Sequence, residues 1–309
     1  MRFNYFDISD NESKILQFLV SKRWFRWASI AELSREFNKA WNTISNAAKS
    51  LENKNLITKQ NGSLKIVKND PAYYFKLFID ALRINELNSD IREIVIYSLG
   101  RANSVCYDAK LKFRSFLIFG SIASGNFDEQ SDIDILIILK DPDDKQRLEK
   151  LKESMVTNKH IQFGKINIIT LSDEEFEKGY LDADDFLVNI LSNNLIIYDD
   201  GFLQNFMQRE LFIPSHKTIF ARMEQLEKDK EKLLELIKLN DMDKLKEEFH
   251  KYLLKEARLE LLRKKMPIPA ITKKDVIEKI RKFNKDLYDE IMNIDKGDIK
   301  HKVLSYVSR

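Results

Sequence analysis

Two acidic residues one position apart, Asp132 and Asp134, follow a Gly-Ser pair in the middle of the chain. The segment from Gly120 to Leu136 reads GSIASGNFDEQSDIDIL, with ten residues between the Gly-Ser pair and the first aspartate. Residues i and i+2 of a strand lie on the same face, so both carboxylates are expected to project side by side. Paired carboxylates are ligands for a hard divalent cation, and Mg²⁺ is the predicted one.

The residues around the Gly-Ser pair predict a bend that binds an anion. Gly120 and Gly125 lack side chains, which lets the backbone approach a ligand closely. Ser121 offers a hydroxyl and neighbouring backbone N–H groups to a phosphate. The alternative interpretation is an Asp-rich surface turn ahead of a strand, with no ligand.

Apolar runs on both sides predict the strands that would position these residues. Residues 113–119 end at the Gly-Ser pair, and residues 133–139 begin inside the Asp-x-Asp pair. The remaining elements predicted for this region are strands at 166–169 and 195–198 and helices at 143–158, 172–178 and 183–192.

The pattern G-S-x₁₀-D-x-D between two strands resembles the signature of the DNA polymerase beta-type nucleotidyltransferase superfamily, and is closest to its minimal nucleotidyltransferase branch. This resemblance implies an NTP ligand and nucleotidyl transfer assisted by two metal ions, Mg²⁺ or Mn²⁺. Asp132 and Asp134 would be the catalytic, metal-holding acids. The nucleotide-binding set implied is Gly120, Ser121, Gly125 and Ser131.

The sequence departs from the family pattern at two places. The third acid of the family falls on the stretch KINIIT, where Asn167 stands instead and becomes the third predicted metal ligand. The basic residue of the family's turn is also missing, since Ile122 and Ser124 occupy its positions. Either another acid substitutes in space, or the core binds nucleotide without transferring it. The candidate substitutes are Asp128, Glu129 and Asp173.

The first 69 residues have the element order of a winged helix-turn-helix domain. Helices are predicted at 10–20, 30–37 and 40–53, followed by two apolar runs around Asn61-Gly62 that predict a hairpin. The third helix would enter a DNA groove and the hairpin would act as the wing. The alternative is a module used for protein contacts, including dimerisation.

A local surplus of basic and amide side chains on this module predicts DNA binding. The predicted nucleic-acid-binding residues are Lys39, Trp41, Asn42, Thr43, Ser45, Asn46, Lys49, Lys59 and Lys65. Lys22, Arg23 and Arg26 add positive charge nearby.

The fold class predicted is α+β multidomain, with a winged helix, a nucleotidyltransferase α/β core containing a short mixed sheet, and a C-terminal helical bundle. The predicted parts are the winged helix at 1–69, linking helices at 70–110, the core at 111–213 and the bundle at 214–309. Helices are predicted at 71–86, 90–107, 216–239, 242–264, 272–283 and 285–295.

Composition bounds the possible settings of the protein. The 309 residues carry a net charge of only +3, so any basic footprint must be local. Cys106 is the single cysteine, which excludes an internal disulfide and favours a reducing, cytoplasmic setting. No stretch approaches a membrane span. We expect no membrane partner, and a possible homodimer.

Three functions follow. The first is a nucleotidyltransferase that binds NTP and Mg²⁺, modifies an unknown acceptor and is held on DNA by its winged helix. The second is a DNA-binding regulator or antitoxin-like protein with a degenerate, non-catalytic core, as Asn167 suggests. An aminoglycoside-type transferase is less favoured, because such enzymes do not need a winged helix.

Overall fold

The residues described by the computed structural model are 8–125, 131–140, 166–182, 184–209, 216–264, 273–295 and 297–307. The helix predicted at 143–158 lies outside them. The chain divides into two units, Met1–Gly179 with Ile190–Glu210, and Tyr180–Asn189 with Leu211–Arg309.

The first unit begins with the N-terminal module, described from residue 8 to residue 69. Its elements are α1 (Asp10–Lys22), β1 (Ala28–Ser29), α2 (Ile30–Glu36), α3 (Trp41–Asn53), β2 (Ile57–Gln60) and β3 (Ser63–Ile66). The three predicted helices and the hairpin are confirmed. Asn61 and Gly62 have φ values of 48° and 74°, as a two-residue hairpin turn requires. The two-residue strand β1, which pairs with β3, was not predicted.

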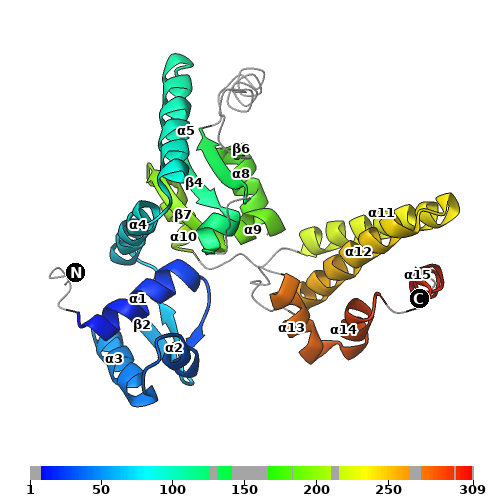
Figure 1. The fold of residues 1–309 in the computed structure, drawn as a ribbon, viewed down its shortest axis with the longest axis horizontal. Helices are drawn as coiled ribbons and strands as arrows, with labels where there is room; N and C mark the ends of the chain where they lie inside the picture. The colour runs from blue at the N-terminus through cyan, green and yellow to red at the C-terminus, as the bar shows by residue number, and fades with distance from the viewer. Residues whose placement is uncertain are drawn as a thin grey trace. The chain divides into compact units, whose positions relative to one another are not determined.

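Two helices connect this module to a sheet, namely α4 (Asp70–Asn85) and α5 (Ser89–Asp108). The Asn69 side chain caps α4 by accepting from the Ala72 amide at 3.0 Å. α4 packs on α1 of the module and also on the sheet strand β7 (Asn194–Asp199). In Figure 1 it lies between the module and the sheet. α4 is therefore shared by both.

The central sheet has four strands in the order β6-β5-β4-β7. β4 (Phe113–Phe119) pairs antiparallel with β5 (Ile133–Leu139) and with β7, while β5 runs parallel to β6 (Ile166–Ser172). The result is a mixed sheet, and the four predicted strands are confirmed.

Helix α5 covers one face of this sheet. Its buried residues, including Ile94, Ala102 and Cys106, share a hydrophobic cluster with Phe116 and Ile135 of the central strands. Cys106 thus serves as core packing. The shorter helices between the sheet strands and after them are α6 (Gly120–Ser124), α8 (Asp173–Leu181), α9 (Asp185–Ser192) and α10 (Phe202–Met207), and most of α9 belongs to the second unit.

The N-terminal module and the start of α4 are joined to α10 by polar contacts. The indole Nε1 of Trp24, itself buried, donates to the Met207 carbonyl at 2.6 Å. The side-chain amide of Gln204 donates to Asp70 Oδ1 at 2.8 Å. These contacts hold the module against the sheet-bearing part of the same unit.

The second unit is built mainly from helices, which are α11 (His216–Leu239), α12 (Met242–Arg263), α13 (Lys273–Phe283), α14 (Lys285–Met292) and α15 (Ile299–Val307). α11 and α12 run side by side, as Figure 1 shows. Leu233, Phe249 and Val303 belong to their shared core. The last helix was not predicted. None of the helices within the described residues combines the length and the apolar composition of a membrane span.

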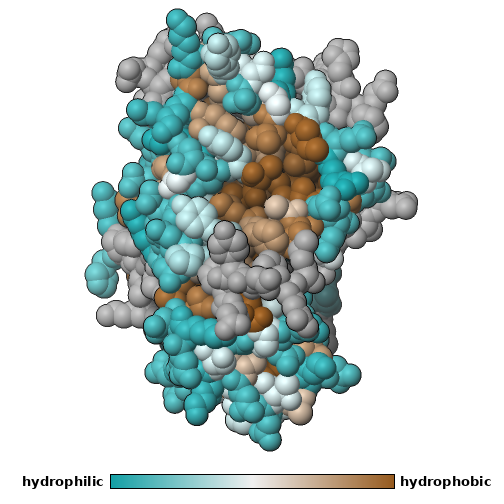
Figure 2. Space-filling model, turned by 90° about the vertical axis from the view of Figure 1, so that its left-hand side faces the viewer, coloured by the Kyte–Doolittle hydropathy of each residue, from teal (hydrophilic) through white to brown (hydrophobic). Residues whose placement is uncertain are grey.

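Apolar side chains also reach the surface of α4 and α5. Phe78, Ile96 and Tyr97 are 39%, 67% and 56% exposed. Figure 2, which faces the side where α4 and α5 lie in Figure 1, shows a broad hydrophobic area.

Candidate active site

The Gly-Ser pair follows directly from β4 and opens the short helix α6, where the sequence predicted a turn. Gly120 has a φ of 75°, and a Cβ added there would overlap the Asp134 carboxylate. Both the backbone angle and this close approach require glycine. Gly125 ends the helix in the left-handed conformation, and Ser124 Oγ donates to the Ser121 carbonyl at 2.8 Å.

The two predicted acids lie at the start of β5. Asp132 is exposed and directly precedes the strand, whereas Asp134 is half-buried within it. Asp134 stands opposite Phe119, the last residue of β4 before the bend. The Asp134 side chain therefore lies against Gly120, at the end of the sheet where the Gly-Ser pair is found. Ser131, of the predicted nucleotide-binding set, is half-buried just ahead of Asp132.

Asn167 occupies the place beside Asp134 on the neighbouring strand. The two residues are in register across the parallel strands β5 and β6. The exposed Asn167 amide donates from Nδ2 to Asp134 Oδ1 at 3.0 Å. One oxygen of the carboxylate thus already has a neutral donor, in the position where the family pattern would place a third acid.

Asp173 cannot replace that missing acid, so this alternative is wrong. It begins α8, after the far end of β6, six residues beyond Asn167. At ~3.3 Å per strand residue, the separation is roughly 20 Å. The Asp173 carboxylate is instead paired with Arg114 Nη2 at 3.2 Å. The other two candidates, Asp128 and Glu129, lie outside the described residues.

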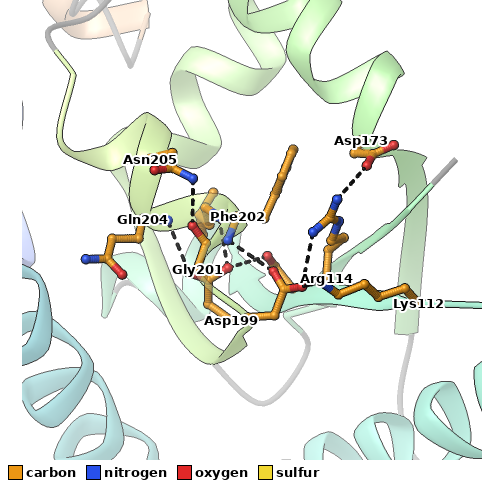
Figure 3. Close-up of polar contacts among 11 residues, drawn as sticks. Lys112, Arg114, Asp173, Asp199, Gly201, Phe202, Gln204 and Asn205 are labelled. Carbon is orange, nitrogen blue, oxygen red and sulfur yellow. Dashed lines mark hydrogen bonds and ion pairs between the residues drawn. The ribbon is translucent and has the colours of Figure 1, made fainter.

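Figure 3 shows the polar cluster at this far end of the sheet. Arg114 bridges Asp173 and Asp200, and Lys112 also pairs with Asp200 at 2.9 Å. Burial acts to raise the pKa of Asp200, but hydrogen bonds from Lys112, the Phe202 amide and Arg114 outweigh it. The pKa of Asp200 is lowered as a result.

Asp199 is a third acid of this cluster and accepts four hydrogen bonds. Its oxygens receive the Ser115 hydroxyl at 2.6 Å, the Tyr73 hydroxyl at 2.8 Å, and the amides of Leu203 and Gln204. Burial, with Asp199 close by, raises the pKa of Tyr73. This cluster was not predicted from the sequence, because its members are scattered along the chain and match no motif. The contacts make it a structural anchor for α4 and α10.

The nine predicted nucleic-acid-binding residues all lie on α3, on the residues just before it, or on the hairpin. None of them is buried. Those classed as exposed are Lys39, Trp41, Asn42, Asn46 and Lys49, and those half-buried are Thr43, Ser45, Lys59 and Lys65.

Two of the additional basic residues are paired within the module. Lys22 contacts Glu36 at 2.8 Å, and Arg23 contacts Glu32 at 2.6 Å. Their positive charge is therefore partly neutralised within the module.

A cavity of about 470 Å³ lies in the second unit and was not predicted. Several charged residues that line the cavity contact one another or other lining residues. Glu227 pairs with Lys230 at 3.0 Å, and Glu260 accepts a hydrogen bond from Asn284 at 2.7 Å. Glu256 accepts from the Tyr306 hydroxyl at 2.6 Å, and burial raises the pKa of this carboxyl.

Comparison with known proteins supports the superfamily suggested by the motif. Residues 109–198 match the family model described as "Nucleotidyltransferase domain". This range includes the bend, the acid pair and Asn167, and it supports nucleotidyl transfer as the general class of activity. No curated protein matches the chain.

Two solved structures are similar to the chain at low identity. One is the spectinomycin adenyltransferase AAD(9) from Enterococcus faecialis, solved with ATP and spectinomycin. It has 12% identity and a TM-score of 0.38, over 70% of this chain and 97% of that one. The other is a nucleotidyltransferase-like protein from Exiguobacterium sibiricum 255-15. It has 12% identity and a TM-score of 0.37, over 64% of this chain and 67% of that one.

Proposed function

We propose that the core binds an NTP with Mg²⁺ at the Gly120-Ser121 bend and the adjacent Asp134, and transfers a nucleotidyl group to an acceptor. The observation that carries this proposal is the Asp134 carboxylate lying against Gly120, where a side chain would overlap it. An acid at the phosphate-binding bend places negative ligands for a cation beside the site of a triphosphate. Ser121 and the amides around it would bind the phosphates.

The residues present fit one hard cation better than two. Asp132 and Asp134 would hold it, with the Asn167 amide as a neutral third group. Among the residues that the structure describes, no group of three or more His, Cys, Asp or Glu could hold a metal ion. Bound Mg²⁺ neutralises the charge that develops on a transferring phosphoryl group.

The second candidate is a regulator that binds nucleotide without transferring it, including an antitoxin-like role. The Asn167 amide that donates to Asp134 favours this function. An amide cannot take a proton from an attacking hydroxyl, and it contributes no charge to a second cation.

A labelled-nucleotide assay separates these functions. The protein is incubated with labelled ATP, CTP, GTP or UTP and Mg²⁺ or Mn²⁺, beside the Asp132→Ala, Asp134→Ala and Asn167→Asp variants. Transfer that is lost in both Ala variants and raised in Asn167→Asp supports the enzyme. Nucleotide binding without transfer, in the wild type and in Asn167→Asp alike, supports the regulator. No nucleotide binding under any condition overturns both.

We also propose that the N-terminal module is a winged helix that binds DNA through α3 and the hairpin. Support comes from the surface position of Asn46 and Lys49 on α3, opposite its buried Ile44 and Leu51. Lys and Asn side chains on one exposed helix face suit phosphate contact and base reading.

Salt dependence tests the DNA proposal. Lys49→Ala should weaken duplex binding and lower the slope of log affinity against log salt by about 1. Lys14→Ala is the matched control, because Lys14 is exposed on α1 rather than α3. Equal effects of the two variants would contradict binding through α3.

A cytoplasmic location and a homodimer stay predictions. The exposed apolar side chains of α4 and α5 make the oligomeric state worth measuring by light scattering. A monomer at all concentrations would contradict the homodimer.

A further inference from the structure

Helix α4 carries a row of polar residues on the face that packs on the sheet. Lys76 and Asp80 are only 2% and 0% exposed, and Arg83 continues the row one turn later. Burying ionised groups is costly, and a well-packed apolar pair would hold two elements together at least as well. Packing of α4 on the sheet alone therefore does not explain why these charged residues are buried.

The buried pair contacts the backbone of β7 next to the bend. Lys76 Nζ donates to Asp80 Oδ2 at 2.7 Å and to the Asn194 carbonyl at 3.3 Å. Asp80 Oδ2 also accepts the Ile196 amide at 3.0 Å. Asn194 stands opposite Phe119, the residue that precedes Gly120. The pair thus fixes the strand that borders the start of the bend.

Arg83 contacts the bend itself. Its Nη2 donates to the carbonyl of Ala123 at 2.6 Å, inside the short helix α6 that Gly120 opens. A helix of five residues leaves its last carbonyls without partners in the helix, so they need donors from elsewhere. A guanidinium on a rigid neighbouring helix supplies such a donor in a fixed direction.

We propose that Arg83 is a positioning residue for the candidate nucleotide-binding bend, which it holds from α4 together with Lys76 and Asp80. The bend then has a fixed conformation before any ligand arrives. The effect on nucleotide binding rests on the proposed function, but the effect on the bend itself does not.

Hydrogen exchange of the ligand-free protein tests the positioning directly. In Arg83→Met, amides of residues 121–125 should exchange about 10-fold faster, because a charged hydrogen bond to the bend is lost. The matched control is Arg92→Met, since Arg92 Nη1 also donates to a backbone carbonyl, that of Asn85, at 3.0 Å. Arg83→Lys keeps a cationic donor and should restore much of the protection. Unchanged exchange in Arg83→Met, or equal acceleration in Arg92→Met, would overturn the proposal.

Affinity for Mg²⁺–ATP gives the second readout. We expect it to fall roughly 10-fold in Arg83→Met, with partial recovery in Arg83→Lys and no change in Arg92→Met. If Arg83→Met fails to fold, both readouts are taken from Arg83→Lys compared with the wild type. We then expect an intermediate effect on exchange and on affinity, and the absence of any effect would overturn the proposal. If the wild type binds no nucleotide, the proposed function fails, and hydrogen exchange still decides the role of Arg83.

Discussion

The two ends of the four-stranded sheet both carry aspartates, yet the partners of these residues differ. At the far end, Asp199 accepts four hydrogen bonds, and Asp173 and Asp200 are paired with Arg114. At the bend, the one described residue that donates a hydrogen bond to the Asp134 side chain is Asn167, through a neutral amide, and Gly120 lies against the carboxylate without a side chain of its own.

This difference separates acids that hold the fold together from acids suited to a ligand. A carboxylate accepts through about four lone-pair sites, so one whose sites are filled has little capacity left for a cation. A carboxylate with open sites beside a bend retains that capacity. The number of partners, rather than the number of acids, distinguishes the two ends.

The largest expected effect is on ligand binding at the bend. Asp134→Ala should lower the affinity for Mg²⁺–ATP by at least about 100-fold, because a charged cation ligand is removed. Isothermal titration calorimetry measures this loss. Asp173→Ala is the control from the far end and should bind as the wild type does. Loss of binding in both variants would remove the distinction between the ends.

At the far end the expected effect is on stability. Asp199→Ala should reduce the free energy of unfolding by about 2–3 kcal/mol, since it leaves hydroxyl and amide donors without their acceptor. Urea unfolding measures the change, and the folded fraction should bind nucleotide normally. Tyr73→Phe removes one of these donors and should cost about 1 kcal/mol. A larger cost in Tyr73→Phe than in Asp199→Ala would contradict the anchoring role.

A pair of glycines sharpens the comparison further. Gly120 at the bend and Gly201 at the far end both have positive φ, but only Gly120 has a side chain in the way of an added Cβ. Alanine at either position should cost about 1–2 kcal/mol of stability for the left-handed backbone. Gly120→Ala alone should also weaken nucleotide binding, by about 10-fold or more, as Asp134 is displaced. Equal binding by both variants would count against the bend as the binding site.

The smallest expected effect is the acid dependence at the far end. Because the folded-state pKa of Asp200 is lowered, its contribution to stability is complete above the unfolded pKa of about 4 and is lost as pH falls below that. Asp200→Asn should therefore flatten the fall of Tm below about pH 4 by a few degrees. Differential scanning calorimetry measures it, and parallel curves for the two proteins would refute the ion-pair explanation.

The sequence predicted the strands and the hairpin because their signals are local. Apolar runs define β4 and β5, and Asn61-Gly62 defines the turn between β2 and β3. The position of Asn167 beside Asp134 followed from matching a family pattern, which already encodes the pairing of β5 with β6. The helix α6 was missed because five residues are too few to show a helical period.

The polar groups of α4 and of the far end could not be found in this way. Lys76 and Asp80 are spaced as an ordinary exposed ion pair on a helix would be, and charged residues are seldom fully buried. Arg114, Asp173 and Asp199 come from separate strands and helices, so they meet only after the sheet has formed. Asp173 was wrongly considered as a substitute for the third acid, because its closeness to β6 in the sequence does not say which end of that strand it adjoins.

The connection between β3 and α4 has one further consequence. Only residues 67–69 separate the hairpin from α4, so the connection between the N-terminal module and this helix is short. If α3 binds DNA, as proposed above, this short connection would restrict how the DNA can turn relative to the bend. A few glycines inserted after Asn69 would make the connection between the N-terminal module and α4 flexible, and the orientation of the module relative to the bend would then vary.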